Sequence, residues 1–273
     1  MDSFNSGKFL TTQTFGNNIR ELISLEDIPI YLNQPAWLRI EQGNICLDVF
    51  IYLRQSSKLY VLGQDALIEG RNELPYFYRS KWFNDLDDGS FITFNDPTLY
   101  LDRSLFGGWW QQNGSVELAK KFIENLSKKI SVKEEDIVCY GASAGGYFVL
   151  ALAGLLRKSK VVADIAQVDL PTSPYKHNVP LLKKAGVEKF KDVFYYWSRK
   201  EPPQNIYFLM NEKDISHIKT QLFYFLEKIN IIYTLEGNMI KNLNIIKYKN
   251  NDLNLRGHSP WEKDSLIKFL KKL

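Results

Sequence analysis

The feature that most constrains the fold of this chain is a tight turn between two apolar segments, within residues 137–150 (IVCYGASAGGYFVL). The apolar run before the turn is typical of a buried strand, and the longer run after it is typical of an apolar helix. The turn has the spacing G-x-S-x-G from Gly141 to Gly145, with Ser143 at its centre. A chain that doubles back at a serine with positive φ has room only for small neighbours, and here they are all glycine or alanine. We therefore predict a strand, a strained turn that exposes the Ser143 hydroxyl, and a helix.

The same turn creates a place for negative charge. The N–H of Ala144 lies at the N-terminus of the predicted helix, where backbone amides are unpaired and anions are favoured. A hydroxyl beside such an N–H suits attack on a carbonyl, because the hydroxyl oxygen attacks and the N–H binds the oxyanion. The alternative interpretation is a glycine-rich turn in which Ser143 only caps the helix.

A serine nucleophile needs a general base, and the chain contains three histidines. His258 lies between a predicted strand at 243–248 and a predicted last helix at roughly 260–271, which is where the base is expected in a fold of this kind. The last helix would open with an N-cap, a first-turn proline and a capping-box glutamate, namely Ser259, Pro260 and Glu262. We predict that His258 is the base, and the alternative is a histidine on a surface loop.

The other two histidines fit the role of base less well. His217 lies three residues after Asp214, on the first turn of a predicted helix at about 216–228. A base so close in sequence to its own orienting acid would be unusual, so we expect His217 on the helix surface or in the wall of the pocket. His177 lies in an irregular proline-rich segment, where we expect no chemical role beyond contact with substrate.

Asp214 is the predicted acid of the site. It follows a strong strand signal at residues 205–210 and precedes the helix that carries His217. An acid just past this strand can accept a hydrogen bond from the far nitrogen of the base, which fixes the tautomer and stabilises the imidazolium. The alternatives that stay open are Glu212, Asp169 and Asp252, and a structural role for Asp214 at the start of the helix.

An oxyanion hole needs a second N–H besides that of Ala144. The apolar run 59–62 is a predicted strand, and Gly63 and Gln64 follow it. We predict that the backbone of Gln64 supplies the second donor and that Gly63 gives the substrate room. The alternative is an ordinary turn.

The order of the predicted elements indicates the fold class. Residues 1 to about 35 are irregular, residues 38–54 alternate as a hairpin that turns at 42–44, and strands and helices alternate from the Ser143 strand to the end. Such alternation predicts a mostly parallel sheet with helices on both faces, and a site at the carboxyl ends of its strands. We predict one α/β domain over residues 1–273. Further predicted strands lie at 59–62, 90–94, 161–168 and 205–210, and a further helix at 116–129.

Two aromatic segments interrupt this alternation. Trp109 and Trp110 lie within residues 101–113, and residues 195–197 read Tyr-Tyr-Trp within a proline-bounded segment at 171–204. We predict that residues 171–204 form a small helical cap insertion. Aromatic side chains can build a wall for a sugar or an acyl chain, so we predict that Trp109 and Trp110 bind substrate, with core packing as the alternative.

Composition excludes several classes of protein. A net charge of +4 gives no case for binding nucleic acid, and no apolar run is long enough to span a membrane. The first residues lack the order of a secretory signal. Two cysteines, Cys46 and Cys139, provide no disulfide framework. We therefore expect a cytoplasmic globular protein.

The Ser143 turn, the Asp214 loop and the His258 loop together resemble the α/β-hydrolase superfamily, over roughly residues 38–273. Residues 96–112, followed by GASAGG, are also similar to bacterial serine-triad proteins of capsule and surface-polysaccharide loci, some of which are polysaccharide O-acetyltransferases. The loop after residue 62 departs from the HGGG form found in lipases, which leaves the substrate class open.

The resemblance implies acyl transfer through an acyl-serine, by an O-acetyltransferase or O-acetylesterase that acts on a bacterial surface polysaccharide. Hydrolysis would need no metal or organic cofactor, and a transferase would use acetyl-CoA as its donor substrate. A carboxylesterase for small esters and a non-catalytic accessory protein of polysaccharide biosynthesis are the alternatives. A peptidase or lipase is less favoured, because neither a secretion signal nor a long apolar lid is visible.

Overall fold

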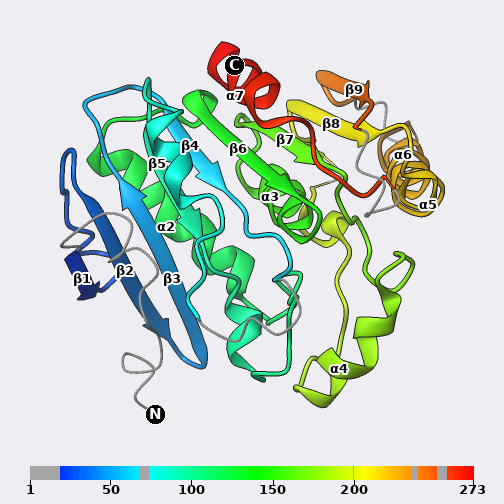
Figure 1. Ribbon diagram of the computed structural model, residues 1–273, viewed down its shortest axis with the longest axis horizontal. Coiled ribbons are helices and arrows are strands. Elements are labelled where there is room, and N and C mark those ends of the chain that lie inside the picture. The colour runs from blue at the N-terminus through cyan, green and yellow to red at the C-terminus, as the bar shows by residue number, and fades with distance from the viewer. Residues whose placement is uncertain (1–18, 68–73, 199, 235–238, 251–256) are drawn as a thin grey trace.

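A nine-stranded sheet forms the centre of the protein (Figure 1). The computed structural model describes residues 19–67, 74–198, 200–234, 239–250 and 257–273. Asp252, one of the alternatives for the acid, lies outside the described residues.

The strands are adjacent in the order β1-β2-β3-β5-β4-β6-β7-β8-β9. From β5 to β9 all neighbouring strands are parallel, while β3 runs antiparallel to both β2 and β5. The prediction of a mostly parallel sheet is confirmed. The strand bounds are β1 Ile19–Leu22, β2 Pro35–Gln42, β3 Ile45–Tyr52, β4 Leu59–Leu62, β5 Ser90–Phe94, β6 Ile137–Ala142, β7 Lys160–Asp164, β8 Asn205–Asn211 and β9 Asn242–Tyr248.

Most of the predicted strands are present, including the hairpin of β2 and β3. Strand β1 was missed, because four residues carry too short a pattern to recognise and their pairing with β2 is a tertiary contact. Strand β7 ends at Asp164, four residues before the predicted end at Val168. The chain leaves the sheet at Ile165, which has a positive φ of 39°.

Helices cover both faces of the sheet, as predicted. Successive side chains of a strand point to opposite faces, and in β8 Tyr207 packs against Phe269 while Phe208 packs against Phe225. The helices that carry these two phenylalanines therefore lie on opposite faces. The α-helix bounds are α2 Ser115–Lys129, α3 Ala144–Leu155, α4 Val179–Lys184, α5 Ile215–His217, α6 Phe223–Ile229 and α7 Lys263–Lys272, with a π-helical turn, η7 Ile218–Leu222, between α5 and α6.

The last helix, α7, begins later than predicted. Its N-cap is Glu262, whose carboxylate accepts hydrogen bonds from the N–H groups of Asp264 and Ser265. Ser259 and Pro260 lie outside the helix, so the predicted N-cap and first-turn proline are wrong. Tertiary hydrogen bonds explain the difference, because the Trp261 N–H donates to a side-chain oxygen of Asp164, 2.8 Å away, instead of following the helix.

The described residues of the segment 171–204 contain one short α-helix, α4, and two 3-10 turns, η5 Lys176–Asn178 and η6 Val193–Tyr196. In Figure 1 helix α4 lies at the periphery, away from the sheet. The later part packs on α3, where the Trp197 indole N–H donates to the carbonyl of Leu150 and the Tyr147 hydroxyl donates to that of Lys191.

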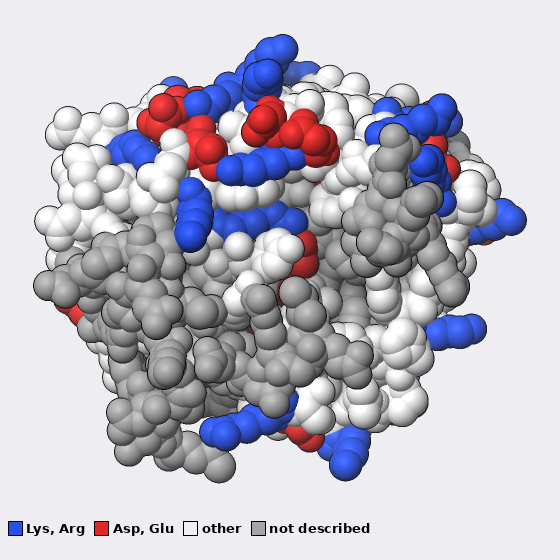
Figure 2. Space-filling model, in the orientation of Figure 1, with Lys and Arg blue, Asp and Glu red and all other residues white. Residues whose placement is uncertain are grey.

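Acidic and basic side chains interleave on the described part of the face seen in Figure 2. Three lysines pair with the acidic residues that precede β5: Lys58 with Asp88, Lys263 with Asp85, and Lys271 with Asp87. The positive charge of these three lysines is therefore compensated by neighbouring carboxylates. Within the described residues, no helix combines the length and apolar character needed to cross a bilayer.

Candidate active site

Ser143 lies between the end of β6 and the start of α3, with a φ of 52° and a ψ of −118°. The turn is as tight as the sequence predicts, since a Cβ added to Gly141 would lie 2.1 Å from the carbonyl oxygen of Gly145. No side chain fits at that position. The geometry leaves Ser143 partly exposed at the carboxyl end of the sheet, while its neighbours on both sides are buried.

The structure brings Ser143, His258 and Asp214 together. The Oγ of Ser143 lies 3.0 Å from Nε2 of His258, and Nδ1 of His258 lies 2.8 Å from Oδ2 of Asp214. Asp214 is buried, and the side chain of His258 is only 15% exposed. An acid, an imidazole and a hydroxyl in this order can move a proton from the hydroxyl to the imidazole.

Backbone contacts hold the two loops of the site together. Asp214 caps α5, because its Oδ1 accepts a hydrogen bond from the N–H of His217, and the structural role that the sequence left open is therefore present as well. Gly257, directly before His258, has a φ of 89°, and an added Cβ would lie 2.5 Å from the backbone of Lys213. Only glycine allows both this conformation and this approach, so the His258 loop can contact the Asp214 loop.

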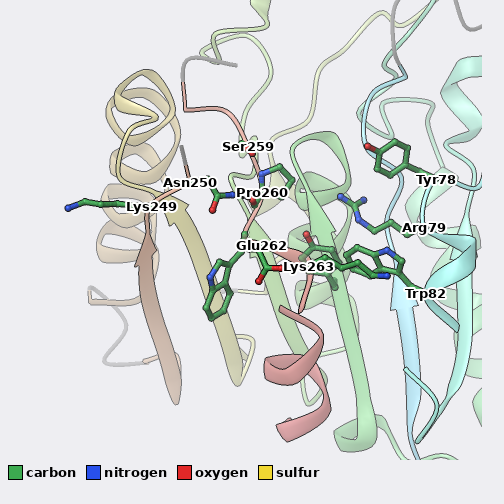
Figure 3. Close-up of a pocket in the computed structure, with 11 residues that line it drawn as sticks. Tyr78, Arg79, Trp82, Lys249, Asn250, Ser259, Pro260, Glu262 and Lys263 are labelled. Atoms are coloured by element: carbon green, nitrogen blue, oxygen red, sulfur yellow. Dashed lines mark hydrogen bonds between the residues drawn. The ribbon is translucent and has the colours of Figure 1, made fainter. Parts of the chain in front are cut away.

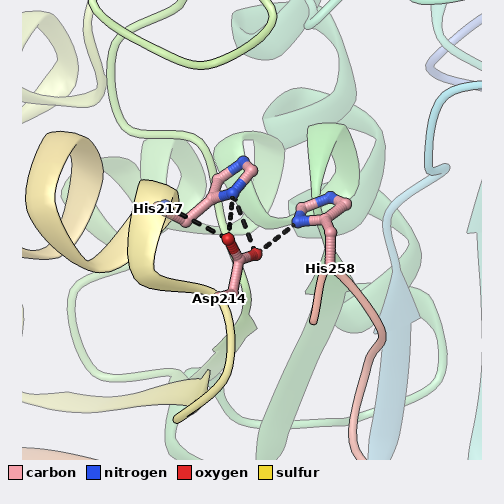
Figure 4. A group of neighbouring side chains, drawn as sticks. All are labelled: Asp214, His217 and His258. Atoms are coloured by element: carbon pink, nitrogen blue, oxygen red, sulfur yellow. Dashed lines mark hydrogen bonds and ion pairs between the residues drawn. The ribbon is translucent and has the colours of Figure 1, made fainter. Parts of the chain in front are cut away.

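His217 is buried and only 2% exposed, so of its two predicted positions the helix surface is wrong, and the wall of the pocket stays a prediction. Its Nδ1 lies 2.9 Å from both carboxylate oxygens of Asp214, including Oδ2, which also contacts Nδ1 of His258 (Figure 4). The rings of His217 and His258 are stacked, with centroids 4.1 Å apart and planes 20° apart. One carboxylate thus serves two imidazoles, an arrangement that the short sequence distance between Asp214 and His217 did not suggest.

Gln167 is a further polar residue at this site, and sequence reasoning missed it. It is fully buried just after β7, with its Oε1 3.1 Å from Oγ of Ser143 and its Nε2 3.0 Å from Nε2 of His217. The Trp109 indole N–H donates to the same Oε1 over 3.0 Å. The one available signal was its place at the carboxyl end of a strand next to the Ser143 strand.

Burial and hydrogen bonding act in opposite directions on the ionisable groups. Burial raises the pKa of Asp214, but the hydrogen bonds from His217 and His258 outweigh it and hold that pKa well below the usual range. Burial lowers the pKa of His217 more than the hydrogen bond to Asp214 raises it. The site therefore holds an ionised carboxylate next to a neutral buried imidazole.

The residues predicted to supply the oxyanion donors, Ala144 and Gln64, lie at and next to the Ser143 turn. Ala144 is the first residue of α3, so its N–H has no acceptor within the helix. The turn at Gly63 packs against the Ser143 turn, since a Cβ added to Gly63 would lie 2.7 Å from the carbonyl oxygen of Gly145. The side chain of the next residue, Gln64, is buried and its Oε1 accepts the N–H of Asp96 at 2.6 Å. The Gln64 backbone as second donor stays a prediction.

The aromatic segments are mostly interior. Trp109 and Trp110 are both fully buried, and Trp110 stacks on Phe148 with a centroid distance of 3.8 Å. Core packing therefore describes Trp110, and the predicted substrate wall is not formed by its side chain in this structure. Trp109 is equally buried, although it touches the site through Gln167. Tyr175, from the segment 171–204, presents an edge to His258 with ring centroids 5.3 Å apart.

The described alternatives for the acid have other partners. Glu212 forms a surface ion pair with Lys249, 3.1 Å away. Asp169 accepts a hydrogen bond from the N–H of Thr172 in a local turn. His177 lies exposed in η5, with its Nε2 3.2 Å from the side-chain amide of Asn178.

Asp214, His217 and His258 offer atoms that could hold a metal ion, all within 4.8 Å of one another. In this arrangement both Nδ1 atoms instead lie at hydrogen-bond distance from the carboxylate (Figure 4). A metal ion would have to replace the protons of those two hydrogen bonds, so the donor set fits a hydrogen-bonded cluster better than a metal site.

A cavity of about 770 Å³ opens beside the residues that follow His258 (Figure 3). Ser259 and Pro260 line one side and Tyr78, Arg79 and Trp82 line the other. Its size is within the range of small-molecule sites. The guanidinium of Arg79 is held by Asp65, with nitrogen–oxygen distances of 2.8 and 2.6 Å, so the charge of this wall is already compensated.

Solved structures with the α/β-hydrolase fold resemble this chain. The capsule O-acetyltransferase of Neisseria meningitidis serogroup A matches with a TM-score of 0.57 and 12% identity, over 85% of this chain and 93% of that one. A mutant of the same enzyme was solved in complex with CoA. An esterase of Pyrococcus furiosus matches with a TM-score of 0.54 and 14% identity, over 88% of this chain and 92% of that one.

Dipeptidyl peptidase 4 of Porphyromonas gingivalis also matches, with a TM-score of 0.56 and 13% identity, over 88% of this chain but only 35% of the peptidase. No protein-family model and no curated protein sequence matches the chain. The likeness therefore shows the fold: a mostly parallel nine-stranded sheet of the α/β-hydrolase type, whose neighbours include acyltransferases and hydrolases.

Proposed function

We propose that this protein transfers an acyl group through a covalent acyl-serine at Ser143. The observation that carries the proposal is the continuous hydrogen-bonded path from Asp214 through His258 to Ser143, with distances of 2.8 and 3.0 Å. Ser143 is partly exposed and lies in the strained turn that presents a nucleophile at the end of a strand.

In the first half-reaction, Oγ of Ser143 attacks the carbonyl carbon of an ester or thioester while Nε2 of His258 takes the hydroxyl proton. The tetrahedral oxyanion is bound by the N–H of Ala144 and, in this proposal, by that of Gln64. The carbonyl re-forms, the bond to the leaving group breaks, and His258 gives its proton to the departing oxygen or sulfur. Asp214 stabilises the imidazolium throughout.

In the second half-reaction a hydroxyl group attacks the acyl-serine. His258 takes the proton of that hydroxyl, and it returns a proton to Oγ of Ser143 when the acyl bond to the enzyme breaks. If the hydroxyl belongs to a sugar the protein is an O-acetyltransferase, and if it belongs to water the protein is an esterase. The residues of the site perform the same proton transfers in both cases.

For the substrates, we propose an acetyl group and a bacterial surface polysaccharide, with acetyl-CoA as donor for the transferase. The fold likeness to a capsule O-acetyltransferase supports this choice, and the likeness to an esterase keeps hydrolysis of small esters as the alternative. We place the reaction in the cytoplasm, where unpaired thiols such as Cys46 and Cys139 persist.

We further propose that the chain acts as one domain in which residues 171–204 form a cap over the site. Tyr175 supports this, because it comes from that segment and its ring edge lies against His258. A transferase must keep water from the acyl-enzyme, and a segment placed next to the imidazole could exclude it.

The test is intact mass spectrometry over time, after the protein is mixed with acetyl-CoA or with p-nitrophenyl acetate. We expect a single acetyl adduct on the wild-type protein and none on Ser143→Ala, because an acetylated side chain elsewhere would remain in the variant. Adduct formation at equal rates on both proteins would overturn the proposal.

The lifetime of the adduct separates the two activities. An adduct that persists until a polysaccharide or oligosaccharide acceptor is added identifies a transferase. An adduct that is lost in buffer alone identifies an esterase. Absence of an adduct from both donors, in a protein that remains folded, would favour a non-catalytic accessory protein.

A further inference from the structure

The side-chain amide of Gln167 has a defined orientation, and its neighbour Trp109 fixes it. The indole nitrogen of tryptophan is a donor only, so the amide atom 3.0 Å from Nε1 of Trp109 must be the oxygen, Oε1. The other amide atom, which faces His217, is therefore the NH₂ group. Both residues are fully buried, so water does not compete for these contacts.

This orientation determines the tautomer of His217. The NH₂ group of Gln167 can only donate, and it lies 3.0 Å from Nε2 of His217, so Nε2 must accept and carries no proton. A neutral imidazole then holds its proton on Nδ1, which lies 2.9 Å from Oδ1 of Asp214. His217 thus donates to the carboxylate, and it does so as an uncharged ring.

The contacts form a closed ring of five residues. It runs from Ser143 to Gln167, His217, Asp214 and His258 and back to Ser143, and each of the five contacts is between 2.8 and 3.1 Å long. The carboxylate of Asp214 contacts both imidazole rings: Nδ1 of His217 lies 2.9 Å from each of its two oxygens, and Nδ1 of His258 lies 2.8 Å from Oδ2 (Figure 4).

We propose that His217 is a positioning residue for the acyl-transfer site: a neutral imidazole, fixed in its Nδ1–H tautomer by Gln167 and Trp109, that holds the carboxylate of Asp214 in place for His258. This inference rests on the proposed function, because it assigns a role relative to the base of that reaction. His217 itself contacts no reacting atom.

Electrostatics explains why the second imidazole has to be neutral. When His258 accepts the proton of Ser143 it becomes an imidazolium, and the ring of His217 is stacked on it at 4.1 Å. A second positive charge at that distance would oppose the proton transfer, with little water present to screen it. The side-chain NH₂ group of Gln167 opposes protonation of His217, because a proton on Nε2 would point at the N–H bonds of that group.

The backbone before Gln167 is strained, and this strain helps to fix the position of the Gln167 amide. Ile165 has a φ of 39°, which is rare for a β-branched residue, and its N–H is held by the carbonyl of Leu209 at 2.9 Å. Two residues later the N–H of Gln167 donates to the carbonyl of Ser143 over 3.3 Å. The loop after β7 thus follows a strained path that places the Gln167 amide between Ser143 and His217.

The first test needs no activity. We would record the ¹H and ¹⁵N resonances of the imidazole rings in the wild-type protein at neutral pH, and assign His217 by its loss in His217→Asn. The expected result is a neutral ring protonated on Nδ1 alone. A ring protonated on Nε2 alone, or on both nitrogens, would overturn the proposal.

Gln167→Glu sharpens this first test. A carboxylate facing Nε2 of His217 can accept a hydrogen bond from a protonated Nε2 and compensate the positive charge, so in this variant His217 should take up a proton from solvent and become an imidazolium with both nitrogens protonated. If the spectrum of His217 were unchanged in Gln167→Glu, the control of the tautomer by Gln167 would be excluded.

The second test compares His217→Asn with His217→Leu. The side-chain NH₂ of asparagine can replace the Nδ1–H donor, whereas leucine fills space without donating. We expect the rate of acetylation of Ser143 by p-nitrophenyl acetate to fall by about 10- to 100-fold in His217→Leu, the size expected for one lost hydrogen bond to a charged group. We expect His217→Asn to recover most of that loss.

The controls separate this inference from the proposed function. Equal acetylation of wild type and Ser143→Ala would overturn the proposed acyl-serine intermediate. The NMR experiment would still test the tautomer of His217, because it does not depend on acetylation. Acetylation of wild type with equal rates in His217→Leu and His217→Asn would overturn the positioning role alone. Thermal unfolding of both variants shows whether they are folded, and if leucine prevents folding the NMR test decides.

Discussion

Two buried aspartates lie at the carboxyl ends of neighbouring strands, and their pKa values are shifted in opposite directions. Asp214 follows β8 and receives hydrogen bonds from two imidazole rings, so its pKa lies well below the usual range despite its burial. Asp164 ends β7, and burial raises its pKa to about 7, against the effect of hydrogen bonds from the Tyr248 hydroxyl and the Trp261 N–H.

The comparison teaches that burial alone does not decide the charge of these groups. Each side chain is nearly inaccessible, with 3% exposure for Asp214 and none for Asp164. The difference lies in the partners, because the ring N–H groups of His217 and His258 both donate to the Asp214 carboxylate and outweigh its burial, whereas for Asp164 the bonds from a phenol and a backbone amide do not.

The two carboxylates also do different things for the same loop. Asp214 binds the ring of His258, whereas Asp164 binds the residues after it, through the Trp261 N–H and through Tyr248. The Tyr248 hydroxyl lies 2.6 Å from Asp164 and 2.9 Å from the carbonyl oxygen of Ser259. A protonated Asp164 would donate to Tyr248, which would then donate to Ser259. We infer that Asp214 orients His258 for the proposed reaction, whereas Asp164 holds the loop after His258 in position.

The largest expected difference concerns activity. Asp214→Asn should lower the acetylation rate of Ser143 by about 10⁴-fold, because an amide can impose the wrong tautomer on His258. The matched variant Asp164→Asn removes a carboxylate of similar burial and should cost less than about tenfold, since no imidazole depends on that charge. The measurement is the rate of adduct formation in each variant. Equal losses in the two variants would contradict the division of roles.

The second prediction concerns stability and pH. Asp164 keeps its proton in the folded state up to about pH 7, whereas the unfolded chain releases it near pH 4. The folded state therefore binds more protons in this window, and the contribution of Asp164 to the free energy of unfolding falls as the pH rises from about 4 to 7. Asp214 acts in the opposite sense, because its lowered pKa gives a contribution that is lost on acidification below about pH 4.

Urea unfolding of wild type and Asp164→Asn between pH 4.5 and 8 tests this sign. The free energy of unfolding of wild type, relative to the variant, should fall on the order of 3 kcal/mol across that range. A difference that stays constant, or that grows with pH, would show that Asp164 is ionised in the folded protein.

The third prediction addresses the link between Asp164 and the His258 loop. Tyr248→Phe removes one hydroxyl and should lower the free energy of unfolding by about 1–3 kcal/mol, the cost of leaving buried partners unpaired. Because Tyr248 reaches the carbonyl next to His258, acetylation should also slow, by about threefold to tenfold. Thermal unfolding and adduct kinetics measure the two effects, and a loss of activity as large as that of Asp214→Asn would place Tyr248 in the chemistry itself.

The smallest expected effect is that of a third acid at the same edge of the sheet. Asp169→Asn should change the acetylation rate by less than about threefold and the free energy of unfolding by less than about 1 kcal/mol, because its partners are a local turn. If Asp169→Asn abolished acetylation while Asp214→Asn kept it, the assignment of the acid would be reversed.

Local chemistry is what made parts of the site predictable. The turn at Ser143 depends on the small size of its neighbours, and strand, turn and helix follow one another within residues 137–150, so the pattern could be read directly. His258 and Asp214 could be proposed because parallel sheets bring the ends of their strands to one edge and only three histidines had to be considered.

Contacts between distant segments could not be predicted in the same way. Gln167 gave no motif, and its importance comes from lying between Trp109, Ser143 and His217, which come from three other elements. The start of α7 was missed for the same reason, because the bond from Trp261 to Asp164 holds the chain out of the helix.

The sequence alone determined a mostly parallel sheet, a strained serine turn and three residues able to form a hydrogen-bonded path at one edge, because periodicity, residue size and strand order carry that information locally. The tertiary structure decided that Trp110 belongs to the core, that the pKa of Asp164 is raised while that of Asp214 is lowered, and that His217 shares the carboxylate with His258. The physical reason is that burial, charge state and tautomer depend on which partners meet in space, and those partners lie far apart in the chain, 97 residues for Trp261 and Asp164 and 115 residues for His258 and Ser143.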